Sequence, residues 1–314
     1  MSEMAENYTW RGRDDTEDGE QGKRWHHIAN ATDSSNGLGL VGFMCDLGVA
    51  INKGRVGAPN GPNAIRNALA NQAWHVKAGL YDAGNVIAQT ELPVAQDVYA
   101  DAVAQQLNQQ SFVIGLGGGH EIAWGSYQGL LTSEGIQKHT RIGIINFDAH
   151  FDLRKPTPLA SSGTPFRQIA EHCQQQRKKF NYCCLGIAKT ANTQALFDYA
   201  EQTSTHYLLD HQCNLNNAIN LLENFLTTVD EVYVTICLDA LPAYVAPGVS
   251  APSALGIQPK FVIEVLQWLG KRSQQSDFVW RLADIAEMNP DFDIDDRTAK
   301  IAARLVHEIV EAVL

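Results

Sequence analysis

The sequence predicts a three-layer α/β/α domain with a mostly parallel sheet of about eight strands. Short apolar runs rich in β-branched residues indicate buried strands, and longer stretches of helical periodicity separate them. Strict alternation of buried strand and helix is typical of a parallel sheet with helices on both faces. The chain has 314 residues, of which 45% are hydrophobic and 19% charged, so it is long enough to bury such a core.

Each element of this fold has its own segment of sequence. The predicted strands are, in chain order, Gly39–Cys45, Gly79–Asp82, Phe112–Leu116, Arg141–Phe147, Tyr182–Ile187, Thr205–Leu209, Glu231–Leu238 and Phe278–Ile285. The predicted helices between and after them are Pro62–Trp74, Val98–Gln109, Glu121–Leu131, Phe166–Lys178, Asn192–Gln202, Leu215–Thr227, Pro259–Gly270 and Arg297–Leu314. Residues 1–37 are rich in charged residues, Asn and Ser, so we expect a polar arm there and a single domain over residues 38–314.

Composition excludes several classes of protein. The formal net charge is −11 and no basic stripe is present, so nucleic acids and membranes are not expected partners. Six cysteines without a Cys-x-x-Cys pair are typical of reduced thiols. Met1–Gln21 does not resemble a signal peptide, and no apolar stretch of about 18 residues occurs. We expect a cytoplasmic protein that acts on a small molecule, and the sequence leaves homo-oligomerisation open.

The fourth predicted strand ends in a group of polar residues, Asp148-Ala149-His150-Phe151-Asp152. Ligands of open parallel sheets bind beyond the carboxyl ends of the strands. Because side chains alternate along an extended chain, Asp148, His150 and Asp152 are expected on one side. Two carboxylates and an imidazole form a suitable site for Mn²⁺, Fe²⁺ or Zn²⁺. The alternative is a solvated strand end with a capping aspartate.

A glycine-rich turn, Gly115-Leu116-Gly117-Gly118-Gly119-His120, follows the third predicted strand. It is not a dinucleotide-binding fingerprint, because the sixth position is His120 rather than glycine. The glycines would allow a tight turn that places His120 at the start of a helix. His120 is therefore either a candidate ligand or only a helix-terminal residue.

Two further strand ends carry candidate residues. Cys237 and Asp239 share a face at the end of the seventh predicted strand. Asp239 follows a buried strand, whereas Cys237 is either a small core residue or, beside a metal, a thiolate. Glu287 follows the eighth predicted strand, where a buried carboxylate could hold a cationic amidine; a surface position is the alternative.

Together these motifs resemble those of the arginase–agmatinase–formimidoylglutamase family. Gly-Gly-Gly-His at 117–120, Asp-Ala-His-Phe-Asp at 148–152, Leu-Asp at 238–239 and Glu-Met-Asn-Pro at 287–290 occur in that family's order, and the resemblance extends from Gly39 onward. It implies a parallel α/β/α fold with two Mn²⁺ ions, between which a hydroxide attacks the amidine carbon of the substrate. The ligands that the resemblance implies are His120, Asp148, His150, Asp152 and Asp239.

The sequence departs from the family pattern at two positions. Cys237 stands where the family usually has an acidic residue that helps to bridge the metals, and a thiolate there would favour Zn²⁺ over Mn²⁺. Ser162 stands where arginases and agmatinases usually have a histidine. The loops 161–167 and 246–252 and the segment 192–194 look like the formimidoylglutamase branch.

That branch implies hydrolysis of N-formimidoyl-L-glutamate to L-glutamate and formamide, a step of histidine degradation. Asp152 is the expected proton carrier, and Glu287 would orient the imino N–H groups. The expected substrate-binding residues are Arg154, Ser162, Arg167, Asn192 and Glu287. The alternatives are an agmatinase or guanidino-acid hydrolase, a single-zinc enzyme like the deacetylases, and a metal-poor binding protein without activity.

Overall fold

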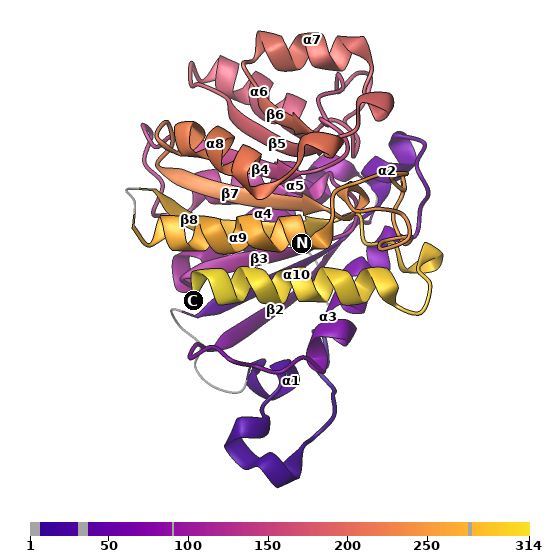
Figure 1. The fold of residues 1–314 in the computed structure, drawn as a ribbon, viewed down its shortest axis with the longest axis vertical. Helices are drawn as coiled ribbons and strands as arrows, with labels where there is room; N and C mark the ends of the chain where they lie inside the picture. Colours follow the sequence, from indigo (N-terminus) through magenta and orange to yellow (C-terminus); the bar gives the residue numbers. More distant parts are fainter. Residues whose placement is uncertain (1–6, 31–36, 90, 276–277) are drawn as a thin grey trace.

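The computed structural model describes residues 7–30, 37–89, 91–275 and 278–314. Within them, eight strands form a single sheet in the order β2-β1-β3-β8-β7-β4-β5-β6, and every pair of neighbours is parallel. The predicted fold class is thereby confirmed (Figure 1). The strands are β1 (Leu38–Met44), β2 (Leu80–Ile87), β3 (Phe112–Gly117), β4 (Ile142–Phe147), β5 (Asn181–Ile187), β6 (His206–Leu209), β7 (Glu231–Cys237) and β8 (Val279–Ala286).

Helices cover both faces of this sheet. One face packs against α3 (Gly61–Ala70), α8 (Leu215–Leu226), α9 (Pro259–Ser273) and α10 (Arg297–Val313). The other face packs against α4 (Leu92–Gln109), α5 (Ile122–Thr132), α6 (Pro165–Gln175) and α7 (Gln194–Gln202). The central strands are buried along their whole length, which explains why their sequences are apolar without alternation.

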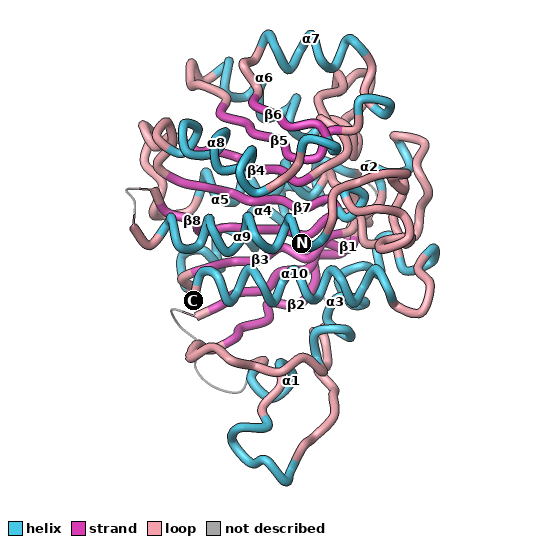
Figure 2. The backbone as a smooth tube through the Cα atoms, viewed as in Figure 1, coloured by secondary structure: helices cyan, strands magenta, loops and turns pink. Residues whose placement is uncertain are grey.

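The remaining helices are short and lie in loops or in the N-terminal region (Figure 2). They are α1 (Trp25–Ile28), α2 (Leu47–Ile51) and the 3₁₀ turns η1 (Thr16–Gly22), η2 (Ala58–Asn60), η3 (Lys189–Ala191), η4 (Asp210–Gln212), η5 (Leu238–Ala240) and η6 (Pro290–Phe292).

Residues 7–30, part of the predicted polar arm, lie along the β2 edge of the sheet. The Trp25 side chain is fully buried and packs edge-on against the Trp74 ring, with 4.9 Å between ring centroids. The Trp10 indole N–H donates a hydrogen bond of 2.8 Å to Asp82. A few aromatic side chains thus attach this polar segment to the domain, and residues 1–6 and 31–36 of the predicted arm lie outside the described residues.

The order of the strands determines where chemistry can occur. The four central strands β3, β8, β7 and β4 are neighbours, and the segments that follow them leave the same edge of the sheet. Each of these segments carries polar residues that the sequence singled out. The carboxyl edge of a parallel sheet is where ligands bind in such folds. Side chains far apart in the sequence therefore meet in one place.

Candidate metal centre

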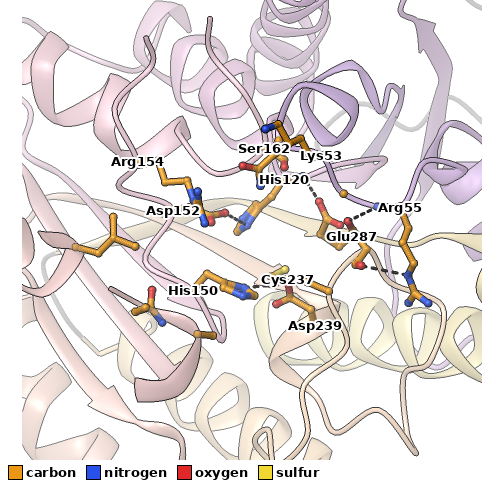
Figure 3. A pocket seen from close by; sticks show the side chains of 17 residues that line it. Lys53, Arg55, His120, His150, Asp152, Arg154, Ser162, Cys237, Asp239 and Glu287 are labelled. Carbon is orange, nitrogen blue, oxygen red and sulfur yellow. Dashed lines mark hydrogen bonds and ion pairs between the residues drawn. The ribbon is translucent and has the colours of Figure 1, made fainter. Parts of the chain in front are cut away.

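The candidate ligands come from the ends of three central strands and lie together (Figure 3). His120 follows β3, the segment 148–152 follows β4, and Cys237 and Asp239 lie at the end of β7. They form two groups whose donor atoms all lie within 4.8 Å of one another, His120 with Asp148 and Cys237, and Asp148 with His150 and Asp239. Asp148 belongs to both groups, so its two carboxylate oxygens face two neighbouring positions.

Distances within these groups are close to those of donors around a shared ion. His120 Nδ1 lies 3.0 Å from Asp148 Oδ2 and 3.0 Å from Asp152 Oδ2. On the other side, His150 Nδ1 lies 3.5 Å from Asp148 Oδ1 and 3.2 Å from Asp239 Oδ2. His120 Nδ1 and Asp239 Oδ1 are nevertheless buried without a hydrogen bond of good geometry. Buried polar atoms without partners are rare, and donors that converge on a cation explain them.

Local structure fixes the direction of the His120 imidazole. Its Nε2 lies 3.0 Å from the Thr235 hydroxyl on β7, which turns Nδ1 toward the aspartates. The backbone N–H of His120 donates 2.9 Å to Glu287 Oε1. The preceding turn needs glycine, because a Cβ on Gly118 would lie 1.9 Å from the carbonyl oxygen of Cys45. A hydrogen bond that fixes the far nitrogen of a ligand histidine is usual in metal sites.

The charges at this site are unbalanced without a cation. Burial alone would lower the pKa of His120, but Asp148 and Asp152 outweigh it and raise that pKa well above its ordinary value. Burial opposes protonation of His150 too, yet the charge of Asp239 and contact with Asp148 raise its pKa to about 12. Burial and the charge of Asp148 raise the pKa of Asp152 to about 6. Both shifts favour positive charge on the imidazoles, because the neighbouring carboxylates lack any other counter-charge.

Cys237 lies inside the cluster rather than in a separate part of the core. Its side chain is 1% exposed, and its Sγ is within 4.8 Å of donor atoms of His120 and Asp148. Burial, together with the charges of Asp148 and Asp239, raises the pKa of this thiol well above its ordinary value. The thiol is neutral in this environment, and a cation beside it could deprotonate it.

Glu287 lines the same cavity from the end of β8. Its backbone φ is +68°, a left-handed conformation that is unusual for a residue other than glycine. One carboxylate oxygen accepts the His120 N–H, and the other, Oε2, is buried without a hydrogen-bond partner. Burial, then the charges of Asp239 and Glu121, raise the pKa of Glu287 to about 8.

Asp152 also has a positive φ of 49°. Strained backbone at two such residues is typical of a functional site.

The donor set fits divalent metal ions. Imidazole and carboxylate ligands suit Mn²⁺, Fe²⁺ and Zn²⁺, and a carboxylate shared by two groups suits a pair of ions. His120 and Asp239 each have a buried atom without a hydrogen-bond partner, and both residues belong to these groups. A third potential cluster, formed by Asp14, His26 and His27, is less suitable because His27 Nδ1 accepts the Arg24 N–H. Because Nδ1 accepts this bond, the proton of the neutral His27 imidazole lies on Nε2. Nε2 is the nitrogen that faces Asp14 and would have to bind the ion.

A cavity of about 300 Å³ is lined by several of the candidate metal ligands. The size is near the lower end for sites that bind small molecules. Its lining includes His120, His150, Asp152, Cys237, Asp239 and Glu287 (Figure 3), and the remaining lining residues, which we call the outer part, are Asn52, Lys53, Gly54, Arg55, Arg154, Ser162, Ala191, Asn192, Leu196, Ser250 and Ala251.

The structure places most of the predicted substrate-binding residues at the cavity, but not all of them. Arg154, Ser162 and Asn192 line the cavity with Glu287. Arg167 does not line it, since its guanidinium pairs with Glu171 at 2.7 Å and lies 3.6 Å over the Tyr199 ring. The helix predicted over Phe166–Lys178 directs Arg167 outward because that side of α6 faces α7 rather than the cavity.

Asn192 lines the cavity, but its amide is already occupied. It accepts the Phe151 N–H at 3.0 Å and donates to the carbonyl oxygens of Ala149 and Ala188 at 2.8 and 2.9 Å. Its main contribution is therefore to hold the backbone between the candidate ligands Asp148 and Asp152.

Among the cavity residues that sequence reasoning missed are two cations, Lys53 and Arg55, which follow α2. The signal was present, because β1 is also a parallel strand and its neighbour β3 leads to His120. Applying the strand-end rule to the first strand would have placed the segment after Cys45 at the site.

Comparisons with known proteins agree on one family. The family model described as "Arginase family" matches residues 36–311. The formimidoylglutamase of Hahella chejuensis is 47% identical over 308 residues, which cover 96% of this chain and 94% of that protein. The formimidoylglutamase of Ralstonia nicotianae is 47% identical over 324 residues, covering 100% of this chain and 98% of that protein.

Solved structures show the same fold. A Trypanosoma cruzi formiminoglutamase with Mn²⁺ matches with a TM-score of 0.81 at 23% identity, over 92% of this chain and 98% of that one. An arginase from Bacillus subtilis matches with a TM-score of 0.71 at 22% identity, over 88% and 98%. Among the helices that the structure describes, none is long and apolar enough to cross a membrane.

Proposed function

We propose that this chain, which belongs to the arginase family, hydrolyses N-formimidoyl-L-glutamate to L-glutamate and formamide using two bound Mn²⁺ ions. The observation that carries the proposal is the pair of ligand groups that share Asp148. The choice of substrate is supported by two relatives that are named formimidoylglutamase and are 47% identical over nearly the full length of this chain.

The ligands divide between two positions. His120, Asp152 and Cys237 would hold the first ion, His150 and Asp239 the second, and Asp148 would bridge them. Two bound cations supply Lewis acidity, so that water can act as hydroxide near neutral pH. Structures of a Trypanosoma cruzi relative with Mn²⁺ support the choice of ion, although Cys237 favours a softer metal at its position.

The chain's own residues position the substrate and carry protons. Water adds to the formimidoyl carbon, the bond to the α-nitrogen breaks, and formamide and glutamate leave. Asp152, which lines the cavity, accepts the proton that water loses and delivers it to the departing amine. Glu287 Oε2, which has no hydrogen-bond partner, accepts an N–H of the formimidoyl group and keeps its carbon above the metal ligands.

The outer residues of the cavity contribute unequally to this reaction. Arg154 supplies positive charge and Ser162 a small hydroxyl that leaves room for the formimidoyl group. Asn192 acts through the backbone that it holds. We exclude Arg167 from substrate binding, because its guanidinium pairs with Glu171 and stacks on Tyr199 outside the cavity.

The rival activity within the family is hydrolysis of a guanidino compound such as agmatine. Lys53, Arg55 and Arg154 all line the cavity, and this positive lining would repel the cationic tail of agmatine. The same lining attracts a dicarboxylate. We therefore favour formimidoylglutamate over agmatine and arginine.

The test is product release from a panel of substrates with Mn²⁺ present. Formamide should form from N-formimidoyl-L-glutamate, while urea release from arginine, agmatine and guanidino acids should be slower by at least about a hundredfold. Efficient urea release would instead assign the chain to the guanidino branch. A chain that binds no metal and releases no product would be a binding protein.

We also propose that the reaction belongs to histidine degradation and takes place in the cytoplasm. The substrate supports the first statement. All six cysteines lie within the described residues as free thiols, which a reducing compartment favours.

A further inference from the structure

Three cationic side chains line the outer part of the cavity, and they are not equivalent. The Arg55 guanidinium donates to the carbonyl oxygens of Ser250, Pro247 and Val249, at 3.2 Å for Ser250 and 3.3 Å for Pro247. It also lies 4.2 Å over the Phe292 ring. With its Nε and Nη2 engaged in this way, Arg55 holds the loop 247–250 in place rather than serving as a free anion-binding fork.

Lys53 and Arg154 differ from Arg55 in having free charged ends. Within the described part of the chain, neither side chain makes a hydrogen bond or an ion pair, although both line the cavity. Their segments meet at Gly163, where an added Cβ would lie 2.9 Å from Arg154 Cδ and 3.2 Å from the Asn52 side chain. The Arg154 N–H also donates 3.0 Å to the Gly163 carbonyl. Two free cations thus flank one turn above the metal ligands.

The backbone of Lys53 has a conformation that glycine usually adopts. After α2, the Gly54 N–H bonds to the Val49 carbonyl and the Lys53 N–H to the Ala50 carbonyl, which is a Schellman motif. Lys53 occupies the left-handed position of that motif, with φ of +62°, where glycine is strongly preferred. The chain places glycine one residue later instead. What sets Lys53 apart is that its free charged end lines the cavity, and a glycine at this position would not supply that charge.

We propose that Lys53 and Arg154 form a two-point clamp that binds one carboxylate each of a dicarboxylate substrate. This inference rests on the proposed function, since formimidoylglutamate carries two carboxylates. The planar guanidinium of Arg154 can bind a carboxylate through two parallel hydrogen bonds, whereas the Lys53 ammonium acts as a point charge. The clamp selects against substrates with a cationic or neutral tail.

Steady-state kinetics of Lys53→Gly and Arg154→Ala with three substrates test the clamp. Each variant should lose roughly tenfold to a hundredfold in kcat/KM for N-formimidoyl-L-glutamate, mainly through KM. N-formimidoylglycine retains only the near carboxylate and N-formimidoyl-4-aminobutyrate only the distant one. One variant should lose activity against the first analogue alone, and the other against the second alone. Unchanged KM values, or equal losses on both analogues, would overturn the clamp.

Arg177→Gly provides a matched control. Arg177 occupies the same left-handed position after α6, where the Lys178 N–H bonds to Cys173 and the Arg177 N–H to Gln174. It is exposed and does not line the cavity above the metal ligands. Both glycine variants should be at least as heat-stable as the wild type, but only Lys53→Gly should change KM. A KM change of the same size in Arg177→Gly would assign the effect to the backbone.

Calorimetric binding of L-glutamate separates this proposal from the proposed function. If the wild type does not hydrolyse formimidoylglutamate but binds L-glutamate, and both variants lose that binding, the clamp stands and the reaction is wrong. If the wild type hydrolyses the substrate and both variants keep its KM, the reaction stands and the clamp is wrong.

Discussion

Two buried clusters of charged residues lie on the same sheet and have opposite character. At the β1–β2 edge, the fully buried Arg66 donates to both oxygens of Asp82 at 2.8 and 2.7 Å, to Asn85 at 2.6 Å and to the Gly84 carbonyl at 2.9 Å. At the carboxyl edge, His120 and Asp239 are buried with atoms that lack hydrogen-bond partners. The first cluster is complete within the protein, whereas the second requires something more.

This difference separates a structural ion pair from a ligand site more reliably than burial does. A buried ion pair is stable only when its remaining donors and acceptors are satisfied. Asp82 and Asp148 are both buried aspartates of the same sheet, yet only Asp148 faces two imidazoles across a gap suitable for ions. A carboxylate whose surroundings lack hydrogen-bond partners is thus the one available for chemistry. Replacing Asp148 and Asp82 by alanine in turn tests that distinction.

The largest expected effect follows loss of the shared ligand. Asp148→Ala should lower kcat/KM by at least about a thousandfold, because both ions lose an oxygen ligand and with it their charge stabilisation. Metal analysis of the purified variant should find less than the wild-type content, while circular dichroism should show a folded chain. Wild-type turnover in this variant would remove Asp148 from the site.

The first cluster, formed by Arg66 and Asp82, should respond in the opposite way. Asp82→Ala leaves the Arg66 guanidinium buried without a counter-charge, so unfolding in denaturant should become easier by about 3–5 kcal/mol. The metal content and kcat of the remaining folded protein should stay at wild-type values. A variant that unfolds normally but loses metal would mean that the two clusters are coupled, and the comparison would fail.

The sequence predicted the eight strands and the meeting of His120 with the segment 148–152, because both depend on local patterns. Periodicity marks buried strands, and the strand-end rule then places the residues that follow them. It did not predict that β2 continues past Gly84 to Ile87. Asp82, Asn85 and a glycine look like a turn until a buried arginine from α3 is known to pair with them.

The contacts of the cationic side chains near the site could not be predicted from the sequence either. Arg167 lies in the first turn of α6 and meets Glu171 and Tyr199, a contact that depends on how α6 packs against α7. Lys53 follows a short helix whose end is defined by backbone hydrogen bonds rather than by a glycine at the usual position. Such features arise from tertiary packing and from strain, neither of which a propensity pattern contains.

A smaller effect is expected from pH. Without a cation, neighbouring carboxylates raise the pKa of His120 well above its ordinary value, and that of His150 to about 12. An ion must displace a proton from each imidazole, so Mn²⁺ affinity should rise by about tenfold to a hundredfold for each pH unit between 6 and 8. Calorimetry in buffers of different ionisation enthalpy should detect released protons. An affinity that is independent of pH would mean that the imidazoles are already neutral.

The smallest expected effect concerns Cys237, the one donor in the cluster that is not a typical ligand of Mn²⁺. Its thiol is buried beside Asp148 and Asp239, and its pKa is raised, so an ion must remove a proton before it can use the sulfur. A carboxylate at this position would offer oxygen to a hard cation and add negative charge. Cys237→Asp should therefore raise affinity for the weaker of two Mn²⁺ ions by about tenfold, since ligand changes of this kind alter affinity on that scale.

Two effects of opposite sign act at Cys237, and a comparison of Mn²⁺ with Zn²⁺ separates them. A cation can deprotonate a coordinating thiol, and the thiolate could then bridge two ions with longer bonds than oxygen makes. In that case Zn²⁺ should bind wild type more tightly than Cys237→Asp, while Mn²⁺ shows the reverse order. Cys183→Ala is a suitable control, because Cys183 is equally buried but packs in the core on the α8–α9 face. If titration finds two equally tight Mn²⁺ ions in the wild type, and Cys237→Asp matches Cys183→Ala for both metals, Cys237 is a core residue and not a ligand.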